Sequence, residues 1–200
     1  MEKSLTHIAL FAALIAALGL MPSMMLATGV PISGQSLGVM LCGTVLGAKR
    51  GGLAALLFIA LVAAGLPLLA GGVGGLGMFL GPRGGFLIGF PVAAFVTGLV
   101  VQNLRARVGV AAFAGAVLGG IVVLYAIGVP VMAAHLSEES VAKMFADLPA
   151  YRELPLPVAL CALFLPGDLI KVVIAALVTA TVARMRPESL LSRALSLIHI

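Results

Sequence analysis

The sequence predicts an all-α membrane protein with six transmembrane helices. Of its 200 residues, 62% are hydrophobic and only 10% are charged, whereas a soluble domain has roughly 45–50% apolar and about 25% charged residues. A water-soluble fold of this size cannot remove so much apolar surface from water. Glycine, proline and basic residues divide the chain into six apolar runs. We therefore interpret residues 1–200 as a single integral membrane domain.

Hydropathy gives approximate limits for the six spans. A membrane-crossing helix needs about 20 apolar residues, and the second run is short by this measure. Pro166 and Gly167 interrupt the sixth run. We therefore expect a short re-entrant or interfacial piece, followed by a spanning helix that begins near Asp168. The expected spans are residues 5–27, 37–48, 52–69, 86–104, 108–134 and 168–183.

The basic residues predict the orientation. An even number of spans places both termini on one side, and basic residues are enriched in cytoplasmic loops. The terminal side carries Lys3, Lys49, Arg50, Arg105, Arg107, Arg184, Arg186 and Arg193, whereas the opposite side carries Arg83, Lys143, Arg152 and Lys171. Both termini are therefore expected in the cytoplasm. The basic residues are scattered rather than clustered, which disfavours nucleic-acid binding.

Three segments of unusual composition lie on the predicted outer face: residues 29–36, the glycine-rich residues 71–85, and residues 135–167. Residues 72–77 match G-x-G-x-x-G, but they follow a predicted membrane helix, and the next acidic residue is Glu138. We therefore do not interpret them as a dinucleotide site. Non-helical backbone at membrane depth is tolerated where it lines a cavity or is buried in protein. The glycines thus form either a ligand-contacting loop or a flexible connector.

Asp168 and Lys171 are the strongest candidates for a ligand site. They are the only charged residues between residues 154 and 183, and their spacing of three puts them on one helix face. A charge at mid-bilayer costs about 2.5–3.5 kcal/mol on insertion scales, so such residues usually pair and face an interior cavity. The simpler alternative makes Asp168 a helix cap and Lys171 its ion-pair partner. The functional interpretation is the polar end of an apolar pocket for an amphiphilic ligand.

Arg83 and Gln35 are further candidates. Arg83, in a Gly-Pro-Arg-Gly sequence, could clamp a ligand carboxylate or contact lipid phosphate. Gln35 offers both a donor and an acceptor, for a ligand or for a neighbouring helix. On the first helix, Ala9 and Ala13 belong to a row of small residues that lets helices approach closely. The residues alone favour packing inside the chain over docking of another subunit.

No metal site, cofactor or catalytic group is expected. Cysteines and histidines are far apart and lack ligand-like spacing. The spans contain no H-E-x-x-H sequence, no Ser/His pair and no second carboxylate, which disfavours an intramembrane enzyme. The chain also lacks G-x-x-x-x-G-K-[ST], so it should not bind ATP at a Walker loop. Active transport would need a partner or an ion gradient.

Four motifs in one order give the chain a resemblance to the BioY family, the biotin-specific S components of energy-coupling-factor transporters. They are VPISGQSLGV at residues 30–39, GLP and AGG within residues 65–72, GPRGGF at residues 81–86, and FLPGDLIK at residues 164–171. The resemblance covers roughly residues 5–183. It implies six helices in a bacterial plasma membrane and an outward-facing biotin pocket. Residues 196–200 match nothing in this pattern.

The resemblance assigns roles to particular residues. Asp168 and Lys171 match the family's Asp and Lys that are implicated in biotin binding. Ala9 and Ala13 match an A-x-x-x-A pattern that docks onto the transmembrane coupling subunit, which works with two ATPases. Docking is thereby favoured over internal packing. Many relatives have a small hydroxyl residue where Arg83 stands, and some use an Arg from a nearby position, so the resemblance leaves the role of Arg83 open. For biotin, we expect Asp168 to accept from a ureido N–H and Lys171 or Arg83 to meet the carboxylate.

Two other transport functions stay open. The chain could be an S component for another vitamin, such as riboflavin or thiamine, although few aromatic residues are available to stack on a large flat ring. It could also be an ion-coupled carrier acting alone. Such carriers typically have inverted repeats with broken helices in both halves, and no repeat is evident.

Overall fold

The computed structural model describes residues 2–20, 24–25, 31–146 and 148–193, and these residues are mostly helical. The longer helices are α1 (Glu2–Leu20), α2 (Gln35–Leu46), α3 (Ala48–Ala63), α4 (Gly84–Asn103), α5 (Val108–Val117), α6 (Leu124–His135) and α9 (Leu156–Met185). A π-helical segment, η2 (Leu118–Val123), joins α5 and α6 into one continuous helix. The shorter elements are β1 (Met24–Met25), β2 (Pro31–Ile32), η1 (Leu76–Phe79), α7 (Glu138–Met144), α8 (Pro149–Arg152) and η3 (Pro187–Ser189).

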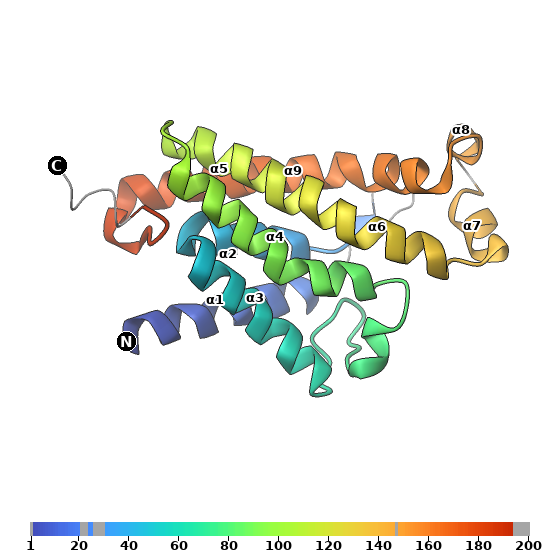
Figure 1. Cartoon of the computed structure of the whole chain (residues 1–200), viewed down its shortest axis with the longest axis horizontal. Helices are drawn as coiled ribbons and strands as arrows, with labels where there is room; N and C mark the ends of the chain where they lie inside the picture. Colours follow the sequence, from blue (N-terminus) through green and yellow to red (C-terminus); the bar gives the residue numbers. More distant parts are fainter. Residues whose placement is uncertain (1, 21–23, 26–30, 147, 194–200) are drawn as a thin grey trace.

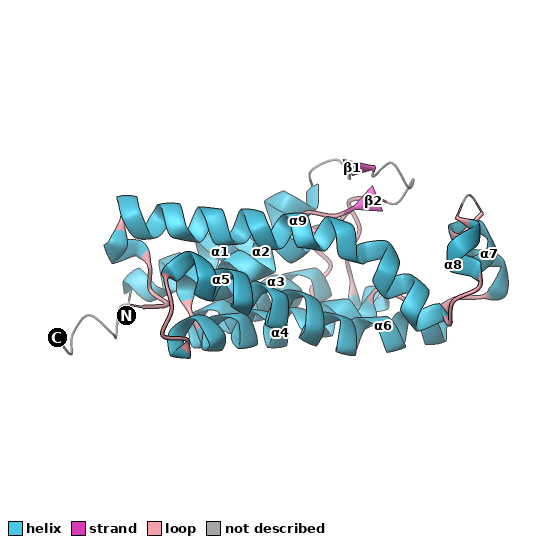
Figure 2. Cartoon of the chain, turned by 90° about the horizontal axis from the view of Figure 1, so that it is seen from above, coloured by secondary structure: helices cyan, strands magenta, loops and turns pink. Residues whose placement is uncertain are grey.

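The helices form an elongated bundle with two different ends (Figure 1). The start of α1, the end of α9 and the α2–α3 and α4–α5 connections lie at one end, which we call the terminal end. The α3–α4 connection, α7 and α8 lie at the other end. The strands β1 and β2 form a small antiparallel pair at the edge of the bundle (Figure 2). The unusual segments of the sequence that the structure describes thus lie away from the terminal end.

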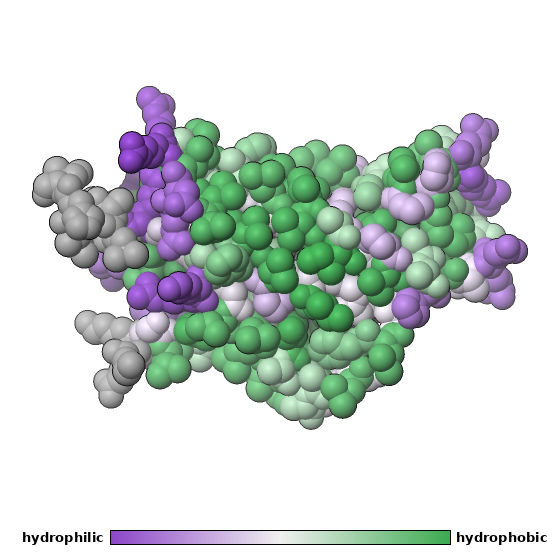
Figure 3. Space-filling view, viewed as in Figure 1, coloured by the Kyte–Doolittle hydropathy of each residue, from purple (hydrophilic) through white to green (hydrophobic). Residues whose placement is uncertain are grey.

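The surface of the bundle is that of a membrane protein. On the face that Figure 3 shows, polar residues gather at both ends, and an apolar band lies between them. Among the described residues, three helices are long and apolar enough to cross a bilayer: Gly84–Asn103, Val108–His135 and Leu156–Met185. Ser4–Leu20 and Gln35–Leu46 are apolar but shorter. The all-helical, apolar character expected from composition is therefore confirmed, while the six-span count and the orientation stay predictions.

The expected start of the sixth helix near Asp168 is wrong. Helix α9 begins at Leu156 and continues to Met185 with Pro166 inside it, so Asp168 is a mid-helix residue and not a cap. Proline removes one backbone donor, but neighbouring helices in a membrane bundle can compensate for such losses. The helix is also longer than predicted, because residues 156–165 belong to it rather than to a separate piece.

The other helix limits shift by up to seven residues. The boundary between the second and third helices lies at Gly47, whose φ of +82° lets the chain reverse there. The third helix ends at Ala63, before Gly65 and Pro67. The first ends at Leu20, not residue 27, and Met24–Met25 pair as a strand; helices usually end before a proline such as Pro22. Residues 26–27, His199 and residues 196–200 lie outside the described part.

Helix α2 is the central element of the bundle. Every residue of α2 except Leu37 is buried, and α1, α3, α4, α5 and α9 all pack against it. Its 12 residues extend about 18 Å, which is shorter than the hydrocarbon core of about 30 Å. Helix α2 therefore begins inside the molecule, and its first turn lies among the surrounding helices.

The terminal end of the bundle is closed by residues that follow α9. Ser192 donates from its hydroxyl to the Thr44 carbonyl (2.7 Å) and from its backbone N–H to the Val45 carbonyl (2.9 Å). These carbonyls lie at the end of α2, where a helix lacks internal donors. Arg193 likewise donates to the carbonyls of Val101, Leu104 and Ala106. The chain after α9 thus caps α2 and α4.

Candidate functional site

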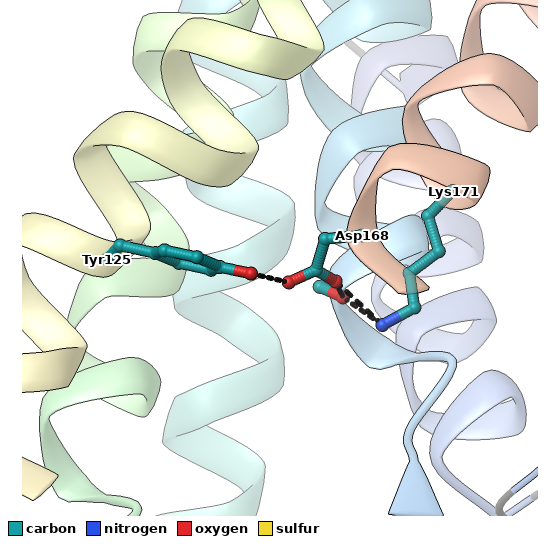
Figure 4. Close-up of polar contacts among 4 residues, drawn as sticks. Tyr125, Asp168 and Lys171 are labelled. Carbon is teal, nitrogen blue, oxygen red and sulfur yellow. Dashed lines mark hydrogen bonds and ion pairs between the residues drawn. The ribbon is translucent and has the colours of Figure 1, made fainter. Parts of the chain in front are cut away.

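Four side chains form a buried polar cluster around Asp168 (Figure 4). Lys171 Nζ lies 2.8 Å from Asp168 Oδ1, and Ser36 Oγ donates to the same oxygen at 3.2 Å. Ser36 Oγ also accepts a hydrogen bond from Lys171 Nζ at 2.9 Å. Tyr125 donates from its hydroxyl to Asp168 Oδ2 at 2.5 Å. We call Ser36, Tyr125, Asp168 and Lys171 the Asp168 cluster.

Three helices contribute to the Asp168 cluster. Asp168 and Lys171 lie one turn apart on α9, Ser36 is in the first turn of α2, and Tyr125 is near the start of α6. The π segment η2 ends at Val123, two residues before Tyr125. A π turn holds an additional residue, so it rotates the following side chains by about 100° relative to an unbroken α-helix. This rotation determines the face on which Tyr125 lies.

The charges of the Asp168 cluster balance one another. The side chains of Asp168 and Lys171 are only 8% and 12% exposed, and isolated charges at such burial carry a large desolvation penalty. The ammonium of Lys171 offsets the carboxylate, and the positive end of the α2 dipole adds to this, because Ser36 lies in the first turn. Lys171 has three donors, of which two are used inside the cluster. Among the described residues, the third N–H of Lys171 has no acceptor.

Apolar side chains surround the polar cluster. Tyr125 belongs to a buried group with Phe145, Leu160, Leu163 and Val172. Phe145 follows α7 and is 1% exposed, so the α7–α8 segment packs onto this group at the end of the bundle away from the termini. A charged pair bordered by apolar and aromatic side chains suits a ligand with both polar and apolar parts.

Gln35 lies next to Ser36 but faces other neighbours. It is buried, and its Nε2 donates to the Leu68 carbonyl at 3.3 Å. A Cβ added to Gly19 would lie 2.5 Å from the same Nε2, so Gln35 packs closely against the end of α1. Consecutive helix residues point in different directions, so Ser36 reaches Asp168 and Gln35 does not. The predicted ligand role of Gln35 is not tested by these contacts.

Arg83 is not part of the Asp168 cluster. Its side chain is exposed, and its guanidinium donates to the Ala70 carbonyl at 3.2 Å. That bond joins two ends of the glycine-rich α3–α4 connection. The structure therefore brings together two of the three predicted charged anchors, Asp168 and Lys171, and leaves Arg83 apart from them.

Ala9 and Ala13 lie on an exposed face of α1, together with Ala17. The opposite face of α1 contains Ala12 and Ile15, which are buried against the rest of the bundle. Ala9 and Ala13 therefore do not pack inside the chain, which corrects the interpretation that the residues alone favoured. Their face is free to contact another molecule.

Sequence reasoning missed Ser36 and Tyr125 as cluster members. Tyr125 is one of only two tyrosines in the chain and interrupts an otherwise apolar run. A rare polar side chain in such a run is the feature that could have identified it as a site residue. Ser36 lies in the first quoted motif but has no distinguishing spacing. The described residues include no group of three or more His, Cys, Asp or Glu that could hold a metal ion.

Comparison with known sequences gives consistent matches over most of the chain. A family model described as the BioY family matches residues 2–188. A biotin transporter BioY from Rhodobacter capsulatus is 54% identical over 198 residues, which is 96% of this chain and 100% of the relative. A biotin transporter BioY from Rhizobium etli is 45% identical and covers 88% of this chain and 90% of the relative.

A solved structure resembles the whole fold. It is the crystal structure of the S-component for biotin from an ECF-type ABC transporter. The match covers 92% of both chains with a TM-score of 0.74, and the sequences are 28% identical. The arrangement of the helices is therefore similar to that of the S-component for biotin.

Proposed function

The chain belongs to the BioY family, and from this membership we propose that it binds biotin in the membrane as the substrate-binding subunit of a biotin importer. The Asp168 cluster carries the proposal, because it is a buried charged group bordered by apolar side chains. Family membership makes the chain a transport protein and not an enzyme. Biotin is the transported ligand, and no cofactor takes part.

The geometry favours one end of biotin for the Asp168 cluster. Asp168 and Lys171 lie 2.8 Å apart, so both contact the same end of a bound ligand, since biotin's two ends are separated by its ring and aliphatic chain. The ureido group offers N–H donors to Asp168 and a carbonyl acceptor to the third N–H of Lys171. A carboxylate in this position would be repelled by Asp168. We therefore assign the ureido end to the Asp168 cluster.

The carboxylate end of biotin then lies away from Asp168 and Lys171. Arg83 is the candidate for this end, because it is exposed and lies in the glycine-rich connection. Its bond to the Ala70 carbonyl is a single hydrogen bond, and the guanidinium fork can still bind a carboxylate with its other donors. Gln35, buried at the start of α2, is a candidate contact for the middle of the ligand.

Import needs partners that supply energy. The solved relative is a component of an ECF-type ABC transporter, which supports a transmembrane coupling subunit and ATP-binding cassette ATPases as partners here. The exposed face of Ala9 and Ala13 is the proposed docking surface, since small residues allow close helix packing. We propose that the protein lies in the bacterial plasma membrane with six spans and cytoplasmic termini, so that the end with α7 and α8 faces outward.

Direct binding tests the proposal. Purified protein in detergent should bind labelled biotin, and excess riboflavin or thiamine should not compete. Asp168→Asn and Lys171→Ala should each abolish measurable binding, because each removes one half of the ureido contact. The double variant Asp168→Asn/Lys171→Met should unfold at a higher temperature than either single change, since it leaves no unpaired buried charge, and still not bind. Near-native affinity in both single variants would refute the site.

The affinities of the variants for biotin and for biotin amide show which residue contacts which end of the ligand. The amide lacks the carboxylate charge and keeps the ureido ring. If Lys171 contacts the ureido end, Lys171→Arg should weaken biotin and biotin amide by the same factor. If Arg83 contacts the carboxylate, Arg83→Gln should weaken biotin by about tenfold and leave the amide unaffected. A loss with Lys171→Arg that is confined to biotin would instead assign Lys171 to the carboxylate.

The docking surface has its own test. Ala13→Leu should block co-purification of the coupling subunit and leave biotin binding unchanged, because the change lies on the exposed face of α1. Ala60→Leu is the matched control, as Ala60 is an exposed alanine on α3. Equal losses with both variants would contradict a specific role for α1.

A further inference from the structure

A shallow apolar groove of about 510 Å³ lies on the surface between α3 and α4. Helices α3 and α4 approach closely at Gly52, where an added Cβ would lie 3.4 Å from Phe95 Cβ and 3.5 Å from the Pro91 carbonyl oxygen, and this contact forms the floor of the groove. The groove lies outside the Asp168 cluster and serves no role in the proposed binding of biotin. Its lining residues are Lys49, Gly52, Leu53, Leu56, Pro91, Val92 and Phe95.

One end of the groove is positively charged. Lys49 is exposed and lies in the first turn of α3, at the terminal end of the bundle. Among the side chains that the structure describes, which start at Ser4 on α1, the ion pairs are Lys143–Glu139 and Lys171–Asp168, and none of these carboxylates pairs with Lys49. The positive end of the α3 dipole adds to the charge of Lys49. An occupant with an anionic group at this end would be stabilised.

The dimensions fit one leaflet of a bilayer. Leu56 is seven residues after Lys49, so the groove extends about 10 Å along α3 toward the middle of the molecule. Half of the hydrocarbon core is about 15 Å thick. An acyl chain lying against Leu53 and Leu56 would therefore place its headgroup near Lys49.

A second groove provides an internal comparison. It lies between α5 and α9, has a volume of about 330 Å³, and is lined by Gly109, Val110, Phe113, Val173, Ala176, Leu177 and Ala180. Both grooves are apolar, but only the α3–α4 groove has a cation among its lining residues. Acyl chains can cover both grooves, whereas selection of an anionic headgroup is expected only at the α3–α4 groove.

We propose that the groove between α3 and α4 is a binding site for an anionic phospholipid of the leaflet at the terminal end. The phosphate pairs with Lys49, and one acyl chain lies over the contact of Gly52 with Phe95, against Leu53, Leu56 and Val92. The site is independent of biotin binding, because none of its residues belongs to the Asp168 cluster.

Native mass spectrometry of the full chain tests this site. The detergent-purified protein is incubated with equal amounts of phosphatidylglycerol and phosphatidylcholine, and the lipids retained are counted. The wild type should prefer phosphatidylglycerol. Lys49→Gln should lower that preference about fivefold, the effect of one basic residue near an anionic surface. Gly52→Leu should lower the retention of both lipids by filling the groove, and Gly52→Ala provides a milder change.

Two matched variants complete the experiment. Arg105→Gln removes an exposed basic residue at the same end of the bundle, and Gly109→Leu fills the second groove; both should keep the wild-type lipid preference. Biotin binding by every variant shows that it is folded. An unchanged preference in Lys49→Gln, or an equal loss in Arg105→Gln, would overturn the site. A Gly52→Leu variant that keeps its lipid would also overturn the site. If that variant lost self-association or binding of the coupling subunit instead, the occupant of the groove would be a second copy of the chain or the coupling subunit.

Discussion

At the scale of single residues, Asp168 shows how a carboxylate is accommodated between membrane helices. It accepts hydrogen bonds from Ser36 on α2, Tyr125 on α6 and Lys171 on α9. Both carboxylate oxygens are thereby satisfied, which buried charges require to avoid a large penalty. The arrangement holds the carboxylate in one orientation, and among the described residues it uses two of the three Lys171 donors.

Tyr125 is expected to orient Asp168 for the ligand. Tyr125→Phe removes the hydroxyl that donates to Asp168 Oδ2 and keeps the ring in the apolar group. A hydrogen bond to a charged group contributes about 1.5–3 kcal/mol, so biotin affinity should fall by about tenfold or more. Isothermal titration of the purified protein measures this change.

The matched control for this prediction is Tyr151→Phe. The Tyr151 ring stacks on Phe145 with centroids 6.1 Å apart, and it is not part of the Asp168 cluster. Its affinity for biotin should equal that of the wild type. Tyr125→Phe binding as tightly as Tyr151→Phe would remove Tyr125 from the site.

Two buried threonines should respond oppositely to replacement by valine. Thr179 donates to Thr44 Oγ1 (2.8 Å) or to the Ala175 carbonyl (2.7 Å), whereas the Thr97 hydroxyl has no hydrogen-bond partner among the described residues. Thr179→Val should therefore destabilise the fold by about 1 kcal/mol, and Thr97→Val should be neutral or stabilising. Thermal unfolding in detergent distinguishes them, and a larger loss for Thr97→Val would contradict this assignment.

At the scale of elements, the π segment η2 connects packing with the site. Gly119 faces Thr97 Oγ1 and the Ala93 carbonyl on α4 so closely that a Cβ would clash with both. The close approach of η2 to α4 depends on the missing side chain, and the extra residue in η2 rotates Tyr125 toward Asp168. Packing of the α5–α6 helix on α4 and the geometry of the Asp168 cluster are thus coupled.

Gly119→Ala is expected to disturb both properties. The added Cβ should destabilise the fold by about 1–3 kcal/mol through overpacking and weaken biotin binding by displacing Tyr125. Gly109→Ala on the same continuous helix is the control, because its Cβ would meet Ala180 Cβ at an ordinary 3.5 Å. Thermal unfolding and titration with biotin measure the two effects. Equal behaviour of the two variants would show that η2 tolerates a side chain.

At the scale of the whole molecule, the two ends of the bundle differ in composition and in predicted location. The terminal end carries most of the basic residues, while the other end carries the glycine-rich connection, α7 and α8. An apolar band separates the ends (Figure 3). Asp168 and Lys171 lie inside the bundle, and α7 and α8 pack at the end that we expect to face outward.

Cysteine labelling tests this orientation. In a Cys42→Ala/Cys161→Ala background, Leu80→Cys places a thiol in the α3–α4 connection, where Leu80 is 79% exposed. A membrane-impermeant maleimide should label it in intact cells. Arg107→Cys, in the α4–α5 connection, should react only after the cells are permeabilised. The reverse pattern would show that the termini face outward.

How much of the protein could be predicted from its sequence differs between fold and site. Hydropathy is a local property, so the apolar runs located the helices to within a few residues at most boundaries. Pro166 was misleading, because the surrounding bundle keeps α9 continuous through it. The spacing of Asp168 and Lys171 placed them on one face of a helix, and their ion pair follows from that spacing.

The sequence by itself determined a helical membrane protein, its family, and the buried pair on α9, because these depend on composition, local motifs and helical spacing. Only the tertiary structure decided which other side chains join Asp168 and Lys171 in the cluster. Tyr125 and Ser36 lie 43 and 132 residues from Asp168 along the chain, and no local pattern connects them. Their meeting depends on the short central helix α2, on the π turn before Tyr125 and on packing around both, which also keeps Arg83 apart.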